Sequence, residues 1–169
     1  KILCDMLADT NESPLKRAIL SSGLAEDMEM TVASGVAQPY LLIIARNIKD
    51  GDSQKIRELI TRTAEELTEK GFGKEIAEAS INRFAFRVKQ TPEPQGLYRS
   101  VAAQNSWLYG GDPLQYLLYD EAIKTLREMA ADKGFERLLK ELLLEPDGVS
   151  LLHMLPSKTL GKEERAAEA

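Results

Sequence analysis

The sequence predicts an α+β fold: an antiparallel β-hairpin packed with helices, followed by a helical hairpin and one further strand. Three observations support this class. Residues 28–34 alternate between apolar and polar side chains, and residues 40–45 form an apolar run of strand length. Most of the remaining chain has the apolar spacing of amphipathic helices. A β-hairpin covered on one face by helices is an α+β layer, half of a larger layered domain.

Two short helices are predicted at the start of the chain. Residues 1–9 read as the end of an apolar helix. Ser13 is expected to cap a second helix that has Pro14 at its first position, because proline needs no backbone N–H there. Gly23 is expected to end this helix, since glycine adopts the left-handed conformation that often follows a helix.

The two predicted strands come next. Met28, Met30 and Val32 share one face of the first strand, which is typical of a half-buried strand. The second strand, at residues 40–45, is almost continuously apolar, so both of its faces are expected to be covered. A turn at residues 35–39 joins the two strands into an antiparallel hairpin.

Helices are predicted for most of the chain beyond the hairpin. The clearest one opens at residues 50–53 and ends at Gly71, with apolar residues at helical spacing. Another covers residues 74–90. The segment 91–96 then breaks the pattern, because two prolines and a glycine disfavour a continuing helix.

A second helix break adjoins Trp107, the only tryptophan of the chain. A helix from residue 97 is expected to end at the pair Gly110-Gly111, and Asp112 is expected to cap the next helix, with Pro113 at its first position. The pattern therefore predicts a helical hairpin with an aromatic cluster at its bend. If Trp107 is a core residue, its replacement by alanine is expected to cost roughly 3–5 kcal/mol, and almost nothing if it is exposed.

The C-terminal part is predicted to contain a helix from near Lys133 to just before Pro146, and then a strand from Val149 to Leu155. Residues 158–169 are charged and rich in alanine, and read as a helix start or a tail. Three regions follow from the change of pattern near Gly73. They are an α+β part at 1–73, a helical region at 74–146, and a strand with the start of a next segment at 147–169.

Composition narrows the classes of function. The chain has 169 residues, of which 43% are hydrophobic and 29% charged, so it is able to bury a core. Its net charge of −5 argues against a nucleic-acid partner, and its apolar runs fall short of the roughly 18 residues of a membrane span. The single cysteine, Cys4, rules out an internal disulfide and is interpreted as a buried thiol. No signal peptide is evident, and the compartment is not indicated, because cytoplasm and organelle matrix both suit a reduced cysteine. The opening residues read as the middle of a helix, so we expect a piece of a longer polypeptide.

The residues by themselves define no active site. The only histidine, His153, lies in a predicted strand and is interpreted as a packed or edge residue, because zinc sites need several ligands. No H-E-x-x-H, H-x-x-E-H, P-loop or G-x-S-x-G motif is present. Other candidates are interpreted as solvated or structural: Gly71-Phe72-Gly73, Glu65-Glu66, Glu163-Glu164, Ser21-Ser22, and the stacking aromatics Trp107 and Tyr109. The prediction is therefore no catalytic, cofactor-binding or metal-binding residue in this chain.

Two stretches resemble one known family. From Leu3 through Ser13-Pro14-Leu15 to Gly71, the chain is similar to the second half of a pitrilysin/insulinase-type metallopeptidase domain, where Ser-Pro-Leu opens a short helix before a β-hairpin. The second stretch resembles the helical-hairpin linker of the presequence-protease subfamily. Its matching residues are Asn82, Phe86, Gly96-Leu97, Trp107-Leu108-Tyr109, Gly111-Asp112-Pro113 and Leu114. Residues from Val149-Ser150-Leu151 onward resemble the strand that follows this linker.

The match covers residues 3 to 165, and it departs from the family in one place. Ala85 stands before Phe86 where the family has an acidic residue, and Lys89-Gln90 follow where it has an Arg-Glu pair. The departure leaves the fold expectation intact and puts in doubt any polar network those residues would make.

The resemblance implies a large clamshell zinc endopeptidase that encloses and cuts unfolded peptides. Its zinc ligands would be two histidines of a His-x-x-Glu-His motif and a distant glutamate, in an N-terminal domain, while the motif glutamate would activate water. No such positions, and no substrate-gripping Arg and Tyr pair, are assigned to this chain. The expected role is therefore that of a noncatalytic domain end plus linker, with zinc in the parent protein, and with other parent domains and unfolded peptides as partners.

Two alternatives remain open at this point. One is a stand-alone helical protein-interaction module on a small α+β base. The other is a catalytically dead homologue that keeps the fold and lacks the zinc motif. The sequence upstream of Lys1 would separate these possibilities.

Overall fold

The computed structural model describes residues 1–34, 36, 38–90 and 93–168 of the chain. Two strands, eight α-helices and one π-helical turn occur within these residues, which confirms the predicted α+β class. In chain order they are α1 (Ile2–Ala8), α2 (Pro14–Ser22), β1 (Asp27–Ala33), β2 (Tyr40–Arg46), α3 (Ser53–Lys70), α4 (Lys74–Lys89), α5 (Gln95–Trp107), α6 (Tyr119–Ala131), α7 (Gly134–Leu139), η1 (Lys140–Leu144) and α8 (Leu160–Glu168). None of the helices in these ranges combines the length and hydropathy that a membrane span needs.

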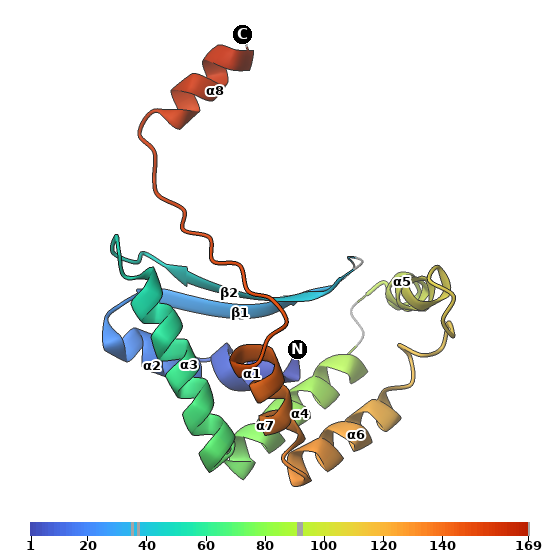
Figure 1. Ribbon diagram of the computed structural model, residues 1–169. Coiled ribbons are helices and arrows are strands. Elements are labelled where there is room, and N and C mark those ends of the chain that lie inside the picture. The colour runs from blue at the N-terminus through green and yellow to red at the C-terminus, as the bar shows by residue number, and fades with distance from the viewer. Residues whose placement is uncertain (35, 37, 91–92, 169) are drawn as a thin grey trace.

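The two strands form the predicted antiparallel hairpin. Met30 of β1 lies opposite Ile43 of β2, and Asp27 lies opposite Arg46. Most of the helices lie on one side of this hairpin (Figure 1). Met28 and Met30 point to that side and are buried, because alternate residues of a strand face the same way. The half-buried first strand is thus confirmed.

The second strand is not covered on both faces, so that expectation is wrong. Tyr40 and Leu42 are 55% and 37% exposed, whereas Leu41 and Ile43, on the other face, pack against the core. In the described part of the chain, the helices supply a cover for one face of the hairpin only. The continuous apolar pattern of β2 therefore includes a second apolar face, which this part of the chain leaves exposed.

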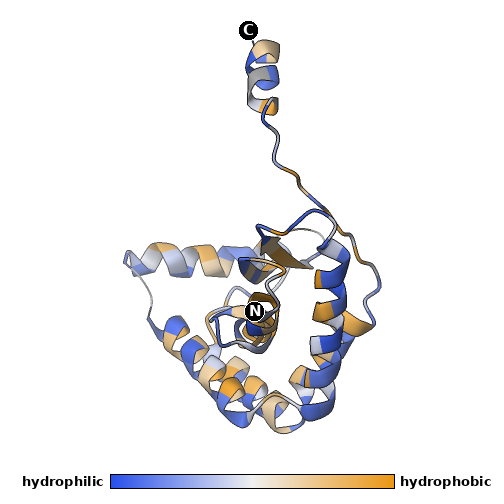
Figure 2. Ribbon diagram, turned by 90° about the vertical axis from the view of Figure 1, so that its left-hand side faces the viewer, coloured by the Kyte–Doolittle hydropathy of each residue, from blue (hydrophilic) through white to orange (hydrophobic). Residues whose placement is uncertain are grey.

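Helix α1 is the centre of the fold. Six of its residues are buried, on all sides of the helix, and a helix that is apolar all round belongs inside a core. It packs against α2, β1 and α4. Figure 2 shows the N-terminal end inside a ring of helices. The prediction of an apolar helix at residues 1–9 is confirmed.

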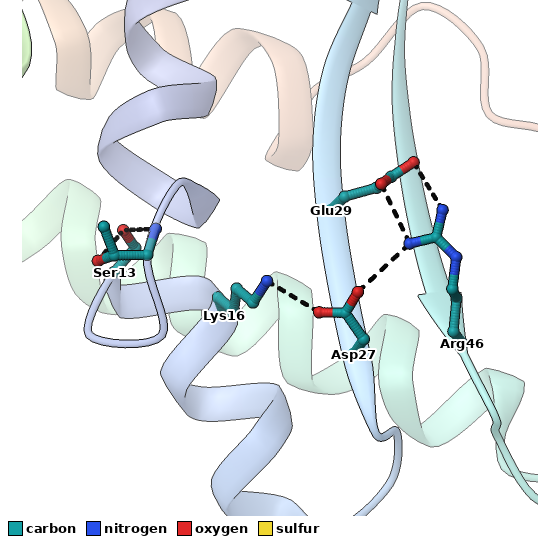
Figure 3. Close-up of polar contacts among 6 residues, drawn as sticks. Ser13, Lys16, Asp27, Glu29 and Arg46 are labelled. Atoms are coloured by element: carbon teal, nitrogen blue, oxygen red, sulfur yellow. Dashed lines mark hydrogen bonds and ion pairs between the residues drawn. The ribbon is translucent and has the colours of Figure 1, made fainter.

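The ends of α2 and α3 are set mainly by glycine, as predicted. Gly23 and Gly71 follow these helices with φ of +67° and +83°. Ser13 occupies the N-cap position and Pro14 opens α2, as predicted, but the Ser13 side chain makes no hydrogen bond to α2. Its Oγ accepts a hydrogen bond from the backbone N of Thr10 at 3.1 Å instead (Figure 3). A serine can satisfy a neighbouring turn as well as a helix, and here the turn is the partner.

A helical hairpin follows the β-hairpin, but its arms are α4 and α6 rather than the predicted segments at 97–109 and from Pro113 onward. Helices α4 and α6 pack side by side and run in opposite directions (Figure 1), with α5 and residues 108–118 at the tip. The predicted start of the second helix at Pro113 is wrong. Asp112 Oδ1 accepts a hydrogen bond from the backbone N of Leu114 at 2.8 Å and so stabilises a turn, and α6 begins only at Tyr119. Helix α5 begins at Gln95, inside the predicted break at 91–96. Residues 91 and 92 of this break lie outside the described residues. Residues 35 and 37 of the predicted turn at 35–39 also lie outside them.

One core joins the parts of the chain before and after Gly73. Five buried residues of the later helices belong to the same cluster as α1 and α2: Ala77, Ile81, Ile123, Phe135 and Leu139. Two ion pairs also tie α4 to α1 and its C-cap residue: Arg87 pairs with Asp5 in α1, and Arg83 pairs with the C-cap Asp9. The helical region is therefore fastened directly on the α+β part.

Residues 149–155 do not form the predicted strand. They have no regular secondary structure, and Leu152 and Met154 are 80% and 81% exposed. A strand needs a neighbour to take its backbone hydrogen bonds, and β1 and β2 pair only with each other in the described chain. The segment has the apolar pattern of a strand, but the described part of the chain contains no strand that pairs with it. Residues 160–168 form α8, the helix start foreseen for the charged tail.

Replacing Ser80 with alanine is expected to raise the free energy of unfolding by about 1 kcal/mol. Ser80 lies on α4 and is 1% exposed, and its Oγ is the one buried side-chain nitrogen or oxygen of the described residues without a hydrogen-bond partner. Alanine removes that unsatisfied hydroxyl at almost the same volume. Urea unfolding of both proteins measures the difference, and a loss of stability would show that the hydroxyl has a partner in solution.

Candidate functional site

The residue types that commonly bind metals lie apart from one another in the described part of the chain. No group of three or more His, Cys, Asp and Glu side chains lies close enough among them to hold a metal ion. His153 is partly exposed in the irregular segment after η1, rather than in a strand. Cys4 is buried in α1, and burial raises the pKa of its thiol, which disfavours the reactive thiolate. The expectation that this chain contributes no metal ligand stays a prediction.

The other sequence candidates lie apart from one another. Glu65 and Glu66 are exposed on α3, and Glu163 and Glu164 are exposed on α8. Ser22 Oγ donates a hydrogen bond to the carbonyl of Ile19 at 2.6 Å, so its hydroxyl closes the end of α2. None of these residues is brought to a partner that would activate it.

A charged network crosses the edge of the hairpin (Figure 3). The Arg46 guanidinium contacts both oxygens of Glu29, each at 3.0 Å, and reaches Asp27 at 3.4 Å. The Lys16 ammonium donates to Asp27 at 2.8 Å. The hydrogen bond from Lys16, followed by one from the backbone of Met28, lowers the pKa of Asp27, and the hydrogen bond with Glu29 raises the pKa of Arg46. These groups join α2 to both strands and make a structural contact.

The Asp27→Asn substitution is expected to lower stability at neutral pH and to matter less in acid. The folded state favours the ionised carboxylate, since the pKa of Asp27 is lowered. That contribution is present above the unfolded pKa of about 4 and is lost as the pH falls through the lower folded pKa. Urea unfolding at a series of pH values should show the two proteins converge on acidification. A difference that stays constant with pH would contradict this.

A groove of about 670 Å³ lies between α4, α6 and α7. Phe72 and Phe135 form its apolar walls, and Arg127 and Glu136 are among its charged residues. Glu136 is 9% exposed and accepts a hydrogen bond from the backbone N of Phe72 at 2.9 Å. This bond fastens the α3–α4 junction to α7 across 64 residues of sequence, and no local pattern predicted it. The groove thus belongs to the joint between the two parts of the chain.

Several exposed apolar residues lie at the tip of the helical hairpin. They are Leu97, Tyr98, Val101, Trp107, Leu108 and Tyr109. Trp107, Leu108 and Tyr109 are 66%, 73% and 84% exposed. Helix α5 is not packed closely on any other described element. The predicted aromatic cluster therefore lies on the surface, and large exposed apolar patches mark interaction sites.

The Trp107→Ala substitution is expected to change the free energy of unfolding by less than about 0.5 kcal/mol. The indole is 66% exposed, so its removal opens little cavity and uncovers little core. Urea unfolding followed by circular dichroism measures the change. A loss of several kcal/mol would show that the indole is a core residue.

The chain is similar in sequence to presequence proteases from different organisms. The chain is 30% identical over 174 residues to presequence protease 1, chloroplastic/mitochondrial, of Arabidopsis thaliana, covering 96% of the chain and 16% of that protein. It is 27% identical over 176 residues to the mitochondrial presequence protease of Schizosaccharomyces pombe strain 972, covering 100% of the chain and 17% of that protein. The chain thus spans about one sixth of the length of the curated relatives it matches. No protein-family model matches the chain.

The fold has a counterpart among solved structures. A crystal structure of a protein assigned as a zinc protease, from Bordetella pertussis Tohama I, superposes with a TM-score of 0.64 at 23% identity. The match covers 82% of this chain and 72% of that one. At this identity it shows the fold, and the sequence relatives supply the family. The chain therefore belongs to the pitrilysin/insulinase-type metallopeptidase family, in its presequence-protease subfamily.

Proposed function

We propose that this chain is a noncatalytic structural and linker segment of a zinc metalloendopeptidase that degrades unfolded peptides inside a clamshell chamber. The observation that carries the proposal is the match to presequence proteases along nearly the whole chain, at about one sixth of their length. Zinc, the peptide substrates and the other domains belong to the parent protein in this proposal.

In this proposal, three regions of the chain have different structural roles. Residues 1–73 are the C-terminal part of a noncatalytic α+β domain, residues 74–146 are the helical-hairpin linker, and residues 147–169 begin the next segment. The exposed outer face of β2 and the unpaired apolar residues of 149–155 support this division. Both are surfaces that the remaining domains of a parent would cover.

The contacts between α4 and the α+β part support a bracing role. Ion pairs join Arg83 to Asp9 and Arg87 to Asp5, one helical turn apart along α4 and along α1 with its C-cap, so they resist rotation of α4 on α1. Glu136 adds a third tie, to the backbone of Phe72. A linker fastened in this way would transmit movement of the domain to the tip, where α5 is free of close packing.

The test compares this chain with the full-length parent. The purified chain should bind no stoichiometric zinc and cleave no unfolded peptide, while the parent should do both. Zinc is measured by elemental analysis and cleavage with a quenched fluorescent peptide. A parent gene that lacks a His-x-x-Glu-His motif upstream of this segment, or zinc-dependent cleavage by the chain alone, would contradict the proposal.

A further inference from the structure

The groove between α4, α6 and α7 contains a buried carboxylate with one unused oxygen. Glu136 is 9% exposed, and its Oε1 accepts the hydrogen bond from the backbone N of Phe72 at 2.9 Å. Its Oε2 makes no hydrogen bond or ion pair within the described residues. Since Ser80 Oγ is the one fully buried unpartnered nitrogen or oxygen among them, Glu136 Oε2 reaches the solvent of the groove. A buried charge is costly unless it is paired, so this oxygen offers a place for a cationic donor.

A cation borders the same groove. Four charged residues line it, and two of them, Lys74 and Glu78, pair with each other on α4 at 3.7 Å. The other two are Arg127 of α6 and Glu136 of α7. They form no ion pair with each other or with another described residue. The groove therefore keeps one positive and one negative group that are free to bind a ligand.

The charge of Arg127 is also left over in a neighbouring hollow of about 530 Å³. Asp120 and Glu128 line that hollow, and they are matched in number by the ammonium groups of Lys89 and Lys124. Arg127 is the fifth charged residue there, so no carboxylate remains for it. Its planar guanidinium suits a carboxylate, which it can hold by two parallel hydrogen bonds.

The rest of the groove is apolar except for Asn82. The apolar lining consists of Phe72, Ala77, Ile81, Ala130, Ala131 and Phe135. The volume of about 670 Å³ lies within the range of small-molecule sites, roughly 300–1,000 Å³. Apolar walls with a few placed polar groups are typical of such sites.

We propose that this groove binds a free α-amino acid with a large apolar side chain. The ammonium group of the ligand donates to Oε2 of Glu136, its carboxylate accepts from Arg127, and its side chain lies against Phe72 and Phe135. A zwitterion is the ligand class that satisfies both charges. A fatty acid would leave Glu136 without a partner, and an alkylamine would leave Arg127 without one, and a site discriminates most strongly against ligands that leave its polar groups unpaired.

The inference goes beyond the proposed function and does not rest on it. It places a ligand at the joint that Glu136 makes between α7 and Phe72. A ligand that binds only the folded chain also stabilises it, so saturating amino acid should raise the unfolding temperature. A parent protein without zinc or peptidase activity would reject the proposed function and leave this site untouched.

The experiment follows the backbone amide of Phe72 by nuclear magnetic resonance. L-leucine is titrated into the isotope-labelled chain, and the Phe72 signal should move, because its acceptor Glu136 gains a second donor. Three probes each lack one feature of leucine. Leucinamide lacks the carboxylate and resembles the first residue of a peptide, N-acetyl-leucine lacks the ammonium and resembles the last, and glycine lacks the apolar side chain. Each should bind about tenfold more weakly than leucine.

The variants remove one charge at a time. Glu136→Gln keeps an oxygen for the Phe72 N–H, should weaken leucine about tenfold, and should no longer favour leucine over N-acetyl-leucine. Arg127→Gln, at an exposed position, should weaken leucine equally and no longer favour it over leucinamide. Arg62→Gln, exposed on α3 and outside the groove, should leave binding unchanged. A Phe72 signal that stays in place, equal binding of leucine and leucinamide, or equal behaviour of the two arginine variants overturns the proposal.

Discussion

The Ile81→Ala substitution is expected to lower the free energy of unfolding by about 2–5 kcal/mol. Ile81 is 1% exposed on α4, in the core cluster that also contains α1 and α2. Deleting its buried methyl groups loses their transfer free energy and leaves a cavity that the packed helices can close only in part. Urea unfolding of both proteins, followed by circular dichroism, gives the difference.

The same helix supplies a matched control. Ile76 is 37% exposed, so Ile76→Ala removes the same atoms from a site that water already reaches, and should cost less than about 1 kcal/mol. The number of transitions is a second result. A shared core predicts one cooperative transition that moves as a whole in Ile81→Ala. A shift confined to a separate transition of the helical region would contradict the single core.

The predictions from sequence succeed where a segment's partners lie inside the described chain. Helix α3 has apolar residues at helical spacing and a terminal glycine, and the structure has it from Ser53 to Lys70. The β-hairpin was predicted from one alternating and one apolar strand, and its helices are present to cover Met28 and Met30. Local propensity and tertiary packing agree in these elements, so the pattern is sufficient.

The failures at β2 and at residues 149–155 share one physical cause. The spacing of apolar residues indicates that a segment is to be covered, but it does not indicate by what. Residues 149–155 have the pattern of a strand and no strand neighbour, and Leu42 belongs to an apolar strand with one open face. Trp107 is of the same kind. Its position beside a helix break was predicted from Gly110 and Asp112, whereas its exposure depends on which elements surround α5.

Polar contacts between residues far apart in the sequence could not be predicted, for a different reason. Glu136 looks like any glutamate of an amphipathic helix, and its bond to the backbone of Phe72 depends on the path of the chain between them. The same is true of the pairs that join α4 to α1 and its C-cap. Resemblance to known sequences, by contrast, did identify the family, because it compares the whole pattern with chains whose partners are already in place.

The turn between α6 and α7 offers the second large effect, since Gly134 fills a place that has no room for a side chain. A Cβ on Gly134 would lie 2.9 Å from Met129 Cβ and 3.0 Å from Met129 Cα. The Cα belongs to the backbone of α6 and cannot swing aside, so the two helices must separate. The turn is already constrained, because Lys133 has a φ of +52°.

Gly134→Ala is therefore expected to lower the free energy of unfolding by about 1–3 kcal/mol, as overpacking does. The control is Gly96→Ala, since Gly96 lies on α5 with open space around it. Alanine there favours the helix and should be neutral or stabilising by up to about 1 kcal/mol. Urea unfolding of the two variants tests the sign as well as the size. Equal effects would show that the α6–α7 contact opens without cost, and that α7 does not hold the helical hairpin against the α+β part.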